Sequence, residues 1–319
     1  MKPIGGFLEL EVRQHDQPYH DKAIALYTAR SCFNLALQYV KPSRVYIPFF
    51  TCDSLIEPLV TNKIPYTFYG LNEQFELSSE ITLHANEYFL YINYWGLKGD
   101  FVKILIERYG DRLIIDNTHS FFTLSYPNNF SFNSPRKIFG VPDGGYLYSP
   151  YQINFQGPRN TGFHYDHLIQ RWMGNQQESY NYFVVYEKSL NCELRRISLL
   201  SEAILSGIDY RMAMESRLRN FALCHEAFES VNNFKFHWNR QDIPFVYPLL
   251  LQRPLNREQF YGLKIYLSVF WKEVLDRHRS GFETDVRLTM NTVPLPIDHR
   301  YTESDMRFLI HTIKEALKV

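Results

Sequence analysis

The sequence has no surplus of either charge and few cysteines. Lys plus Arg and Asp plus Glu each number 34, so the formal net charge is zero. No basic surplus therefore points to a nucleic acid or an anionic membrane as a partner. The four cysteines are widely spaced and form no C-x-x-C pair, which argues against a zinc site or a disulfide framework. We expect a protein of the reducing cytoplasm.

Long apolar runs and the common nucleotide-binding motifs are also missing. No stretch approaches the ~20 apolar residues of a membrane-spanning helix, and the N-terminus lacks the apolar core of a signal peptide. Neither G-x-G-x-x-G nor G-x-x-x-x-G-K-[ST] occurs, which disfavours a dinucleotide or P-loop site. His164 and His167 lack a third ligand of clear spacing, so we expect no metal. These absences predict a soluble protein.

The 319 residues, 45% of them hydrophobic, are enough for one large domain and a smaller one. Strands alternate with helices in the first part of the chain, which implies right-handed crossovers and a mainly parallel sheet. We expect the large domain at 1–234, with an N-terminal arm and a linking helix, and the small domain at 235–319. The expected strands are 7–12, 44–48, 66–69, 87–93, 113–116 and 243–251, and the expected helices 33–40, 53–59, 100–109, 165–186, 211–231, 258–270 and 303–317.

A lysine and two other functional groups follow a buried strand. Leu113–Ile115 has the unbroken apolar character of a strand buried on both faces. Asp116 ends it, at the place where open α/β sheets bind ligands. His119 comes next, and Lys137 precedes the pair Gly144–Gly145. Taken singly, such an aspartate or lysine is more often an ordinary turn or surface residue. Together the groups suit pyridoxal phosphate (PLP), whose ring nitrogen needs an acid and whose aldehyde forms an imine with a lysine.

This stretch resembles the DegT/DnrJ/StrS family of sugar aminotransferases. The family's acid segment reads I-E-D-A-A-H, and Ile114–His119 matches its spacing. Its lysine segment reads S-F-x-x-x-K with Gly-Gly seven residues on, and Gly144 lies at that distance from Lys137. The resemblance implies an α/β fold, type I of the PLP-dependent transferases, with a mainly parallel central sheet flanked by helices and a smaller C-terminal α+β domain.

The resemblance also assigns roles to these residues. Lys137 would be the Schiff-base lysine, Asp116 would pair with the pyridine nitrogen, and His119 would lie near the ring hydroxyl. Ser131 would contact the phosphate, although it lies one residue further upstream of the lysine than in the family.

A phosphate site near the N-terminus is implied in the same way. The segment Thr28–Leu37 takes the place of the family's S-G-T-A-A-L-x-L-A-L, in which amides at the helix start bind the phosphate of PLP. A helix N-terminus suits an anion because its N–H groups and its dipole both favour negative charge. Arg30 and Ser31 would occupy those positions. Ala29 replaces the family's glycine, so an ordinary helix cap is the alternative.

Other positions concern the neighbouring subunit and the substrate. Arg196 matches the arginine of the family's N-Y-R-M segment, which reaches the phosphate of the second subunit, but Leu194 replaces the asparagine. The alternative for Arg196 is a surface ion pair. Tyr94 would line the substrate pocket, or is simply buried at a strand end. Cys52 lies where the family often stacks an aromatic ring on the pyridine. The resemblance implies a homodimer with active sites at its interface.

The leading hypothesis is a PLP-dependent aminotransferase that acts on a keto-sugar nucleotide, with glutamate as amino donor. Surface polysaccharide or deoxyaminosugar biosynthesis would be its setting. A second hypothesis is a fold-type-I protein that no longer catalyses and serves as a binding or regulatory partner, and Ala29, Cys52 and Leu194 motivate it. A third is a PLP enzyme of another reaction type. The dehydratases of the family carry histidine in place of the lysine, so Lys137 favours amino transfer.

Overall fold

The structure is a computed structural model, and it describes residues 10–12, 18–162, 164–239, 241–277 and 280–319. Of the strand expected at 7–12, residues 7–9 lie outside the described residues, and residues 10–12 are not in a strand. In the described part of the chain no helix combines the length and the apolar character needed to cross a membrane.

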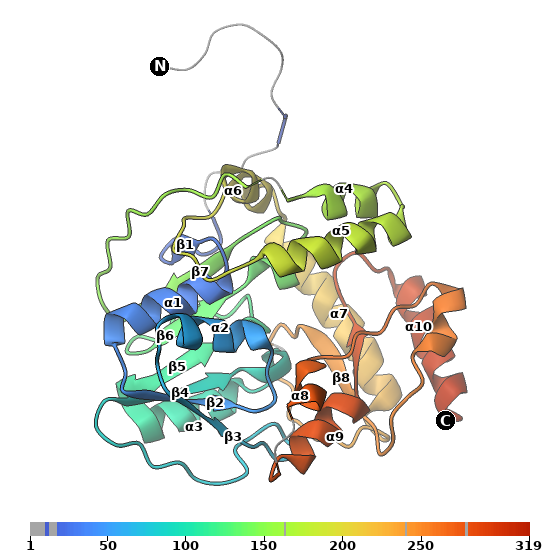
Figure 1. Cartoon of the computed structure of the whole chain (residues 1–319). Coiled ribbons are helices and arrows are strands. Elements are labelled where there is room, and N and C mark those ends of the chain that lie inside the picture. Colours follow the sequence, from blue (N-terminus) through green and yellow to red (C-terminus); the bar gives the residue numbers. More distant parts are fainter. Residues whose placement is uncertain (1–9, 13–17, 163, 240, 278–279) are drawn as a thin grey trace, which may run out of the picture.

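A seven-stranded sheet forms the centre of the molecule (Figure 1). The neighbours from β6 to β3 are parallel, whereas β7 is antiparallel to both β1 and β6. The expectation of a mainly parallel sheet is therefore confirmed. In spatial order the strands are β1 (Ile24–Leu26), β7 (Gly145–Tyr148), β6 (Phe130–Asn133), β5 (Leu113–Asp116), β4 (Glu87–Ile92), β2 (Arg44–Pro48) and β3 (Tyr66–Tyr69).

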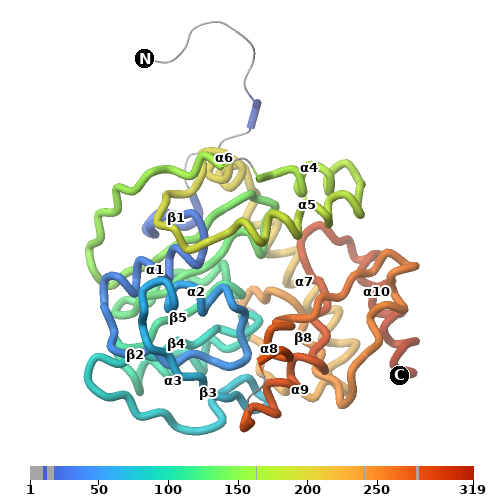
Figure 2. Tube along the Cα trace, in the orientation of Figure 1, coloured from blue at the N-terminus to red at the C-terminus, as the bar shows by residue number. Residues whose placement is uncertain are grey.

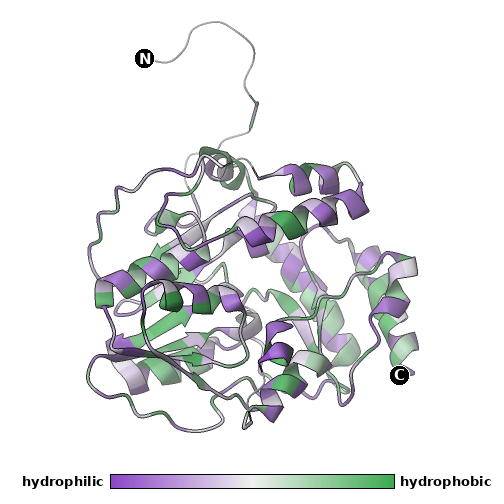
Figure 3. Ribbon diagram, in the orientation of Figure 1, coloured by the Kyte–Doolittle hydropathy of each residue, from purple (hydrophilic) through white to green (hydrophobic). Residues whose placement is uncertain are grey.

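Helices cover both faces of this sheet. On one face lies α1 (Ala29–Val40), whose Phe33 ring stacks on Phe132 of β6 at 5.7 Å. On the other lies α3 (Gly99–Tyr109), whose Tyr109 ring stacks on Phe89 of β4 at 4.7 Å. The helix α2 (Asp53–Thr61) packs beside α1. Much of the central sheet is hydrophobic (Figure 3), and the helices on both of its faces explain the unbroken apolar strands.

The rest of the chain adds a helical hairpin and a second, two-stranded sheet. The hairpin is α4 (Asp166–Trp172) and α5 (Gln176–Ser189), and α6 (Leu199–Ser206) follows it. The long α7 (Tyr210–Phe228) contacts both β8 and the last helix, α10 (Glu303–Leu317), beside the main sheet (Figure 2). The remaining elements are β8 (Val246–Leu250), β9 (Thr292–Pro296), α8 (Glu273–Asp276), α9 (Glu283–Asn291) and the 3₁₀ turns Tyr94–Gly96, Gly110–Arg112, Pro135–Lys137 and Glu258–Leu263.

The helix expected at 258–270 is wrong. Only the 3₁₀ turn Glu258–Leu263 forms, and Lys264 ends it with a left-handed backbone (φ 59°). The chain then runs irregularly into Phe270 and Trp271, whose rings pack into an aromatic cluster. Burial of these two rings outweighs the helical pattern of the sequence. One hydrophobic core joins residues on both sides of the boundary expected at 234/235, and the division into two domains remains a prediction.

Candidate active site

Asp116, His119 and Lys137 come together at the C-terminal edge of the parallel strands. Asp116 ends β5 and is buried, and its Oδ1 accepts a hydrogen bond from the Thr118 N–H at 2.8 Å. Burial raises the pKa of Asp116 to about 6, and the Lys137 ammonium opposes that rise. The same ammonium, together with burial, holds the pKa of His119 well below its ordinary value. The charge of Lys137 thus acts on both other groups.

His119 is fully buried and lies among aromatic rings. Its ring is parallel to Trp271 (5.4 Å between centroids, 1° between planes) and stacks on Phe245 at 4.7 Å. The Trp95 N–H donates to His119 Nδ1 at 3.3 Å, so the proton of the neutral ring resides on Nε2. That Nε2–H has no partner among the described residues. A buried donor without an acceptor is costly, and His119 is therefore suited to donate to a bound ligand.

The backbone around His119 adopts unusual conformations. Trp95 and Trp271, whose rings flank His119, both have left-handed φ angles of 63° and 47°. Gly96 has φ 73°, and a Cβ there would lie 2.7 Å from the His119 carbonyl oxygen, so no other residue fits this close approach. Bulky residues in the left-handed region are rare and cluster at functional sites. The conformation of the Trp95–Gly96 turn therefore marks this region as a ligand site.

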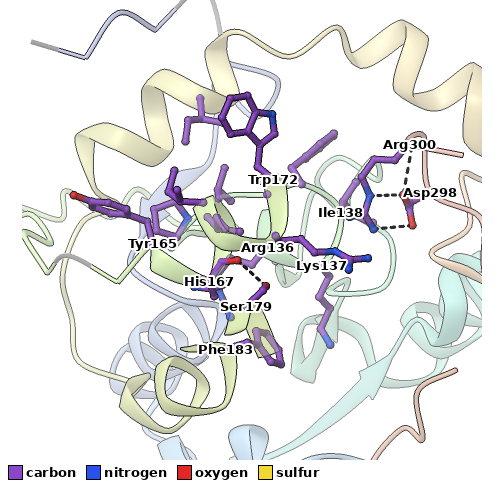
Figure 4. Close-up of a pocket in the computed structure, with 18 of the residues that line it drawn as sticks. Arg136, Lys137, Ile138, Tyr165, His167, Trp172, Ser179, Phe183, Asp298 and Arg300 are labelled. Carbon is purple, nitrogen blue, oxygen red and sulfur yellow. Dashed lines mark hydrogen bonds and ion pairs between the residues drawn. The ribbon is translucent and has the colours of Figure 1, made fainter. Parts of the chain in front are cut away.

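A cavity of about 1440 Å³ opens beside Lys137. The Lys137 Nζ lies 5.7 Å from the Phe245 ring centroid and 6.0 Å from that of Phe270. Figure 4 shows Lys137 extending between the α4–α5 hairpin on one side and the Asp298–Arg300 pair on the other. Asp298 is the one acidic residue in the described lining. The cationic residues of the lining are Arg136, Lys137, Arg159, Arg171, Arg217 and Arg300.

The expected phosphate site at the start of α1 is occupied by the chain itself. Thr28 caps α1 by accepting from the Ser31 N–H at 3.1 Å. The Ser31 hydroxyl donates to the Glu193 carbonyl at 2.6 Å, and Arg30 binds Glu57 and the Leu190 carbonyl, both at 2.8 Å. Carbonyl oxygens of the segment 190–193 thus face this helix start. They repel an anion, and neither Arg30 nor Ser31 lines the cavity beside Lys137.

Ser131 points to the face of the sheet opposite to that of Asp116. Asp116 pairs with Phe132, whose ring packs on the α1 face, whereas Ser131 pairs with Ile115. Because side chains alternate along a strand, Ser131 and Asp116 lie on opposite faces. The one additional residue before Lys137 accounts for this difference, since a shift of one residue reverses the face. Ser131 therefore does not share the sheet face of Asp116; its hydroxyl is buried without a partner among the described residues, and its contact with a phosphate stays a prediction.

Among the predicted site residues, Lys137 lines the cavity, whereas Asp116, His119, Tyr94, Arg196 and Cys52 are not among its lining residues. Tyr94 is fully buried and its hydroxyl donates to the Phe50 carbonyl at 2.8 Å, so it is a core residue at the strand end rather than a pocket residue. Arg196 is exposed, and its Nε donates to the Gly157 carbonyl at 3.1 Å. Cys52 is half-buried and precedes α2. Arg196 does not itself line the cavity, although its carbonyl accepts from the N–H of Asn160, which does.

One buried carboxylate holds the lysine loop to the segment that follows Arg196. Asp143 accepts from the Ser198 hydroxyl at 2.7 Å, from the Ser198 N–H at 3.0 Å, from the Asn160 amide at 2.8 Å and from the Ser201 hydroxyl. Gly144 follows with φ 130°, and a Cβ on Gly145 would lie 2.5 Å from the Thr28 backbone. Small residues here let β7 pack directly on the start of α1.

Comparison with solved structures gives the fold. The sugar aminotransferase CalS13 from Micromonospora echinospora aligns with a TM-score of 0.65 at 14% identity, over 93% of this chain and 88% of that one. The putative sugar aminotransferase Spr1654 from Streptococcus pneumoniae, in its PMP form, aligns at 0.66 and 11% identity, over 95% and 91%. A DegT DnrJ EryC1 StrS aminotransferase from Brucella abortus aligns at 0.61 and 13% identity, over 93% and 88%.

These similarities show that the chain has the α/β fold of these aminotransferases, as expected from the sequence. Neither the known sequence families nor the curated protein sequences match the chain. Trp271, Phe245, Phe270 and Arg217 were not predicted as site residues. Phe270 ends the segment 258–270 that was expected to be helical, and Trp271 directly follows it. A buried arginine on a helix has no recognisable sequence signal.

Proposed function

We propose that this chain is a PLP-dependent aminotransferase that transfers an amino group from glutamate to a keto-sugar nucleotide. The observation that carries the proposal is the grouping of Lys137, Asp116 and His119 at the edge of the sheet, within a fold shared with sugar aminotransferases. We propose surface polysaccharide or deoxyaminosugar biosynthesis as its setting. A cytoplasmic location is proposed from the composition and from the four widely spaced cysteines.

The residues at this edge fit the ring of PLP. The Nε2–H of His119 is a buried donor without an acceptor among the described side chains, and a ring hydroxyl oxygen supplies one. The Asp116 carboxylate can hold the proton of the pyridine nitrogen, and its ionisation becomes favourable beside that positive charge. Lys137 supplies the amine that binds the aldehyde. When bound, PLP supplies that aldehyde and an electron-withdrawing ring.

Each residue then has a distinct task. Lys137 holds the cofactor and, once released by the donor amine, carries the proton between donor and cofactor through its Nζ. Asp116 keeps the ring nitrogen protonated, because its burial among apolar groups strengthens the ion pair. His119 is neutral, since burial and Lys137 lower its pKa, and it orients the ring through Nε2. The aromatic rings around His119 exclude water from these steps.

The cavity beside Lys137 suits an anionic acceptor. Its described lining contains six cationic residues and one acidic one, and arginine binds phosphate groups through paired N–H donors. Aromatic side chains of the hairpin, including Phe183, add surfaces on which a base can stack. These features support a sugar nucleotide, which combines phosphates with a base.

We propose a homodimer in which Arg196 serves the neighbouring active site. Arg196 is exposed and does not line the cavity of its own chain. The α4–α5 hairpin and α6, which line this cavity, also expose large apolar side chains: Ile169, Trp172, Met173, Tyr180, Val185 and Leu199. A second copy of the chain would cover this apolar surface, and in the same dimer Arg196 would reach the active site of the neighbouring subunit.

Mixing two inactive variants tests the shared site. If Arg196 acts across the interface, mixed Lys137→Ala and Arg196→Ala subunits will form some dimers with one intact site, and partial activity will return. Light scattering should show a dimer that Trp172→Glu weakens, with the exposed Lys103→Glu as control. A monomer, or an inactive mixture despite confirmed subunit exchange, refutes the shared site.

The cofactor assignment has a direct test. Purified protein with PLP should show an absorbance band that glutamate shifts, and borohydride reduction followed by peptide mass analysis should place the pyridoxyl group on Lys137. A label on another lysine, or no label, refutes the assignment.

The second candidate is a protein of this fold that binds partners and does not catalyse. The observation in its favour is the start of α1, where the carbonyls of residues 190–193 take the place expected for the phosphate. In that case glutamate will leave the spectrum unchanged even if PLP binds. Retention of Lys137, Asp116 and His119 in one place favours the aminotransferase. A glutamate-dependent spectral change decides between the two.

A further inference from the structure

Arg217 is a charged side chain buried in the middle of α7. It is 1% exposed, although arginine is almost never fully buried without a partner of opposite charge. Its Nη1 donates to the carbonyls of Pro244 and Phe245, at 3.3 and 3.0 Å. Its Nε is buried and has no acceptor within the described ranges. The guanidinium therefore has one edge bound to the backbone and one buried donor left over.

Three other arginines of the cavity already have carboxylate partners. Arg136 pairs with Glu187, Arg159 with Glu202 at 2.7 Å, and Arg300 with Asp298 at 2.7 Å. Asp298 also lies close enough to raise the pKa of Arg217, but both of its oxygens accept from Arg300. Burial outweighs this effect and lowers the pKa of Arg217 to about 10, so the guanidinium remains charged at neutral pH.

Arg217 lines the same cavity as Lys137, and Phe245 connects them. The Phe245 carbonyl accepts from Arg217, and the Phe245 ring lies under the Lys137 Nζ at 5.7 Å. The Phe245 N–H in turn donates to the Trp95 carbonyl at 2.9 Å, beside His119. Phe245 therefore contacts both groups, the guanidinium through its carbonyl and the lysine amine through its ring.

A carboxylate is the ligand that completes this arrangement. Carboxylates bind guanidinium groups through two parallel N–H donors, and the bond is strongest where water is excluded. Because Arg217 and Lys137 line the same cavity, an amino acid bound by its carboxylate at Arg217 would hold its amine within the cavity that Lys137 also lines. A phosphate is larger and is better served by the more exposed arginines near the hairpin.

We propose that Arg217 binds a carboxylate of the amino donor and so selects amino acids over other amines. The inference rests on the proposed aminotransferase function, because that function supplies the donor. Arg217 contacts the substrate in this proposal, whereas its bonds to Pro244 and Phe245 serve to hold it in position.

Glutarate, which has the carboxylates of glutamate without its amine, is the probe. Calorimetry on the full-length protein without cofactor should show glutarate binding that Arg217→Gln weakens at least tenfold and Arg217→Lys weakens less. Arg211→Gln, an exposed arginine of the same helix that does not line the cavity, is the matched control and should bind as the wild type does. With cofactor, Arg217→Gln should raise KM for glutamate far more than KM for a simple alkylamine, which has no carboxylate to bind.

The outcomes separate this proposal from the proposed function. Equal glutarate binding in the wild type and Arg217→Gln overturns the role of Arg217, even if the pyridoxyl label is found on Lys137. Binding that depends on Arg217 supports it, even if no label is found. Should Arg217→Gln fail to fold, Arg217→Lys carries the test, since it keeps the charge. If neither variant folds, Arg217 serves the fold alone and the proposal is overturned.

Discussion

The start of α1 and the surroundings of His119 differ in how their polar groups are satisfied. At the start of α1, side chains of Thr28, Arg30 and Ser31 donate to carbonyls of residues 190–193. By contrast, the buried Nε2 of His119 and the buried Nε of Arg217, which lines the cavity, lack partners among the described residues. An unsatisfied buried donor costs about 1–3 kcal/mol. A ligand bound at His119 would therefore remove an energetic cost, whereas the polar groups at the start of α1 are already satisfied by the chain.

Removal of the Lys137 amine should have the largest effect on the His119 side. Lys137→Ala should lower the rate of the reaction with glutamate by about 10²–10⁴-fold, because Nζ is the proposed proton carrier. Its stability should change by less than about 1 kcal/mol, since the described contacts of Nζ are with aromatic rings. Stopped-flow absorbance and urea unfolding measure the two quantities, with Lys103→Ala as control. An unchanged rate would assign the proton transfer elsewhere.

Asp143 holds the loop that follows Lys137 to the segment 198–201, and its loss should destabilise the fold. Asp143→Ala leaves Ser198, Ser201 and Asn160 without their common acceptor. We expect the free energy of unfolding to fall by at least about 2 kcal/mol, because hydrogen bonds to a charged group are strong and because the donors left without an acceptor are buried. Urea unfolding measures this loss, and the exposed Asp111→Ala should show none. Equal midpoints for the two variants would contradict the role of Asp143.

Asp116→Asn should stabilise the protein without cofactor while impairing its chemistry. Burial raises the pKa of Asp116 from 3.8 to about 6, so the folded state binds the proton more tightly than the unfolded state. The stability contributed by this group is present below pH 3.8 and is lost as the pH rises through about 6. At pH 8 the variant should therefore be more stable, by up to about 3 kcal/mol, and the gain should disappear near pH 4.

Urea unfolding at both pH values measures this difference, and a gain that does not depend on pH would contradict it. With cofactor present the order should reverse, because the ring nitrogen then compensates the charge of Asp116.

The smallest expected effect concerns Ser31. Ser31→Ala should lower the free energy of unfolding by about 1 kcal/mol, because its hydroxyl bonds to Glu193 and not to a ligand. The dissociation constant for PLP should then change by no more than about twofold, measured by fluorescence titration. A tenfold weaker affinity would show that Ser31 binds the phosphate after all. It would also require the segment 190–193 to move when the cofactor binds.

Much of the sheet and part of the site were predictable from sequence. Apolar runs such as Leu113–Ile115 are specific to buried parallel strands, and the strand-end position of Asp116 follows from the same pattern. The short strand β6 was not predicted, and neither was the turn that divides the helix expected at 165–186 into α4 and α5. Their boundaries depend on contacts with distant segments rather than on local periodicity.

The roles of Ser131, Tyr94 and Arg30 show where spacing alone fails. One additional residue before Lys137 turns Ser131 to the other face of the sheet, and a sequence motif does not show this change. Tyr94 lies at the right strand end, yet the left-handed turn at Trp95 and Gly96 leaves its ring in the core. Arg30 is held by Glu57 and Leu190, which are far from it in the sequence.

The tryptophans beside His119 also give the protein an optical signal of its own. Of four tryptophans in the sequence, Trp95 and Trp271 have rings 5.3 and 5.4 Å from the imidazole. Their emission will fall when an absorbing cofactor occupies this site. Trp172, on the opposite wall of the cavity, is largely exposed, and its emission will shift to shorter wavelength when a second copy covers it. Intrinsic fluorescence can thus follow cofactor loading and subunit association separately, without any label.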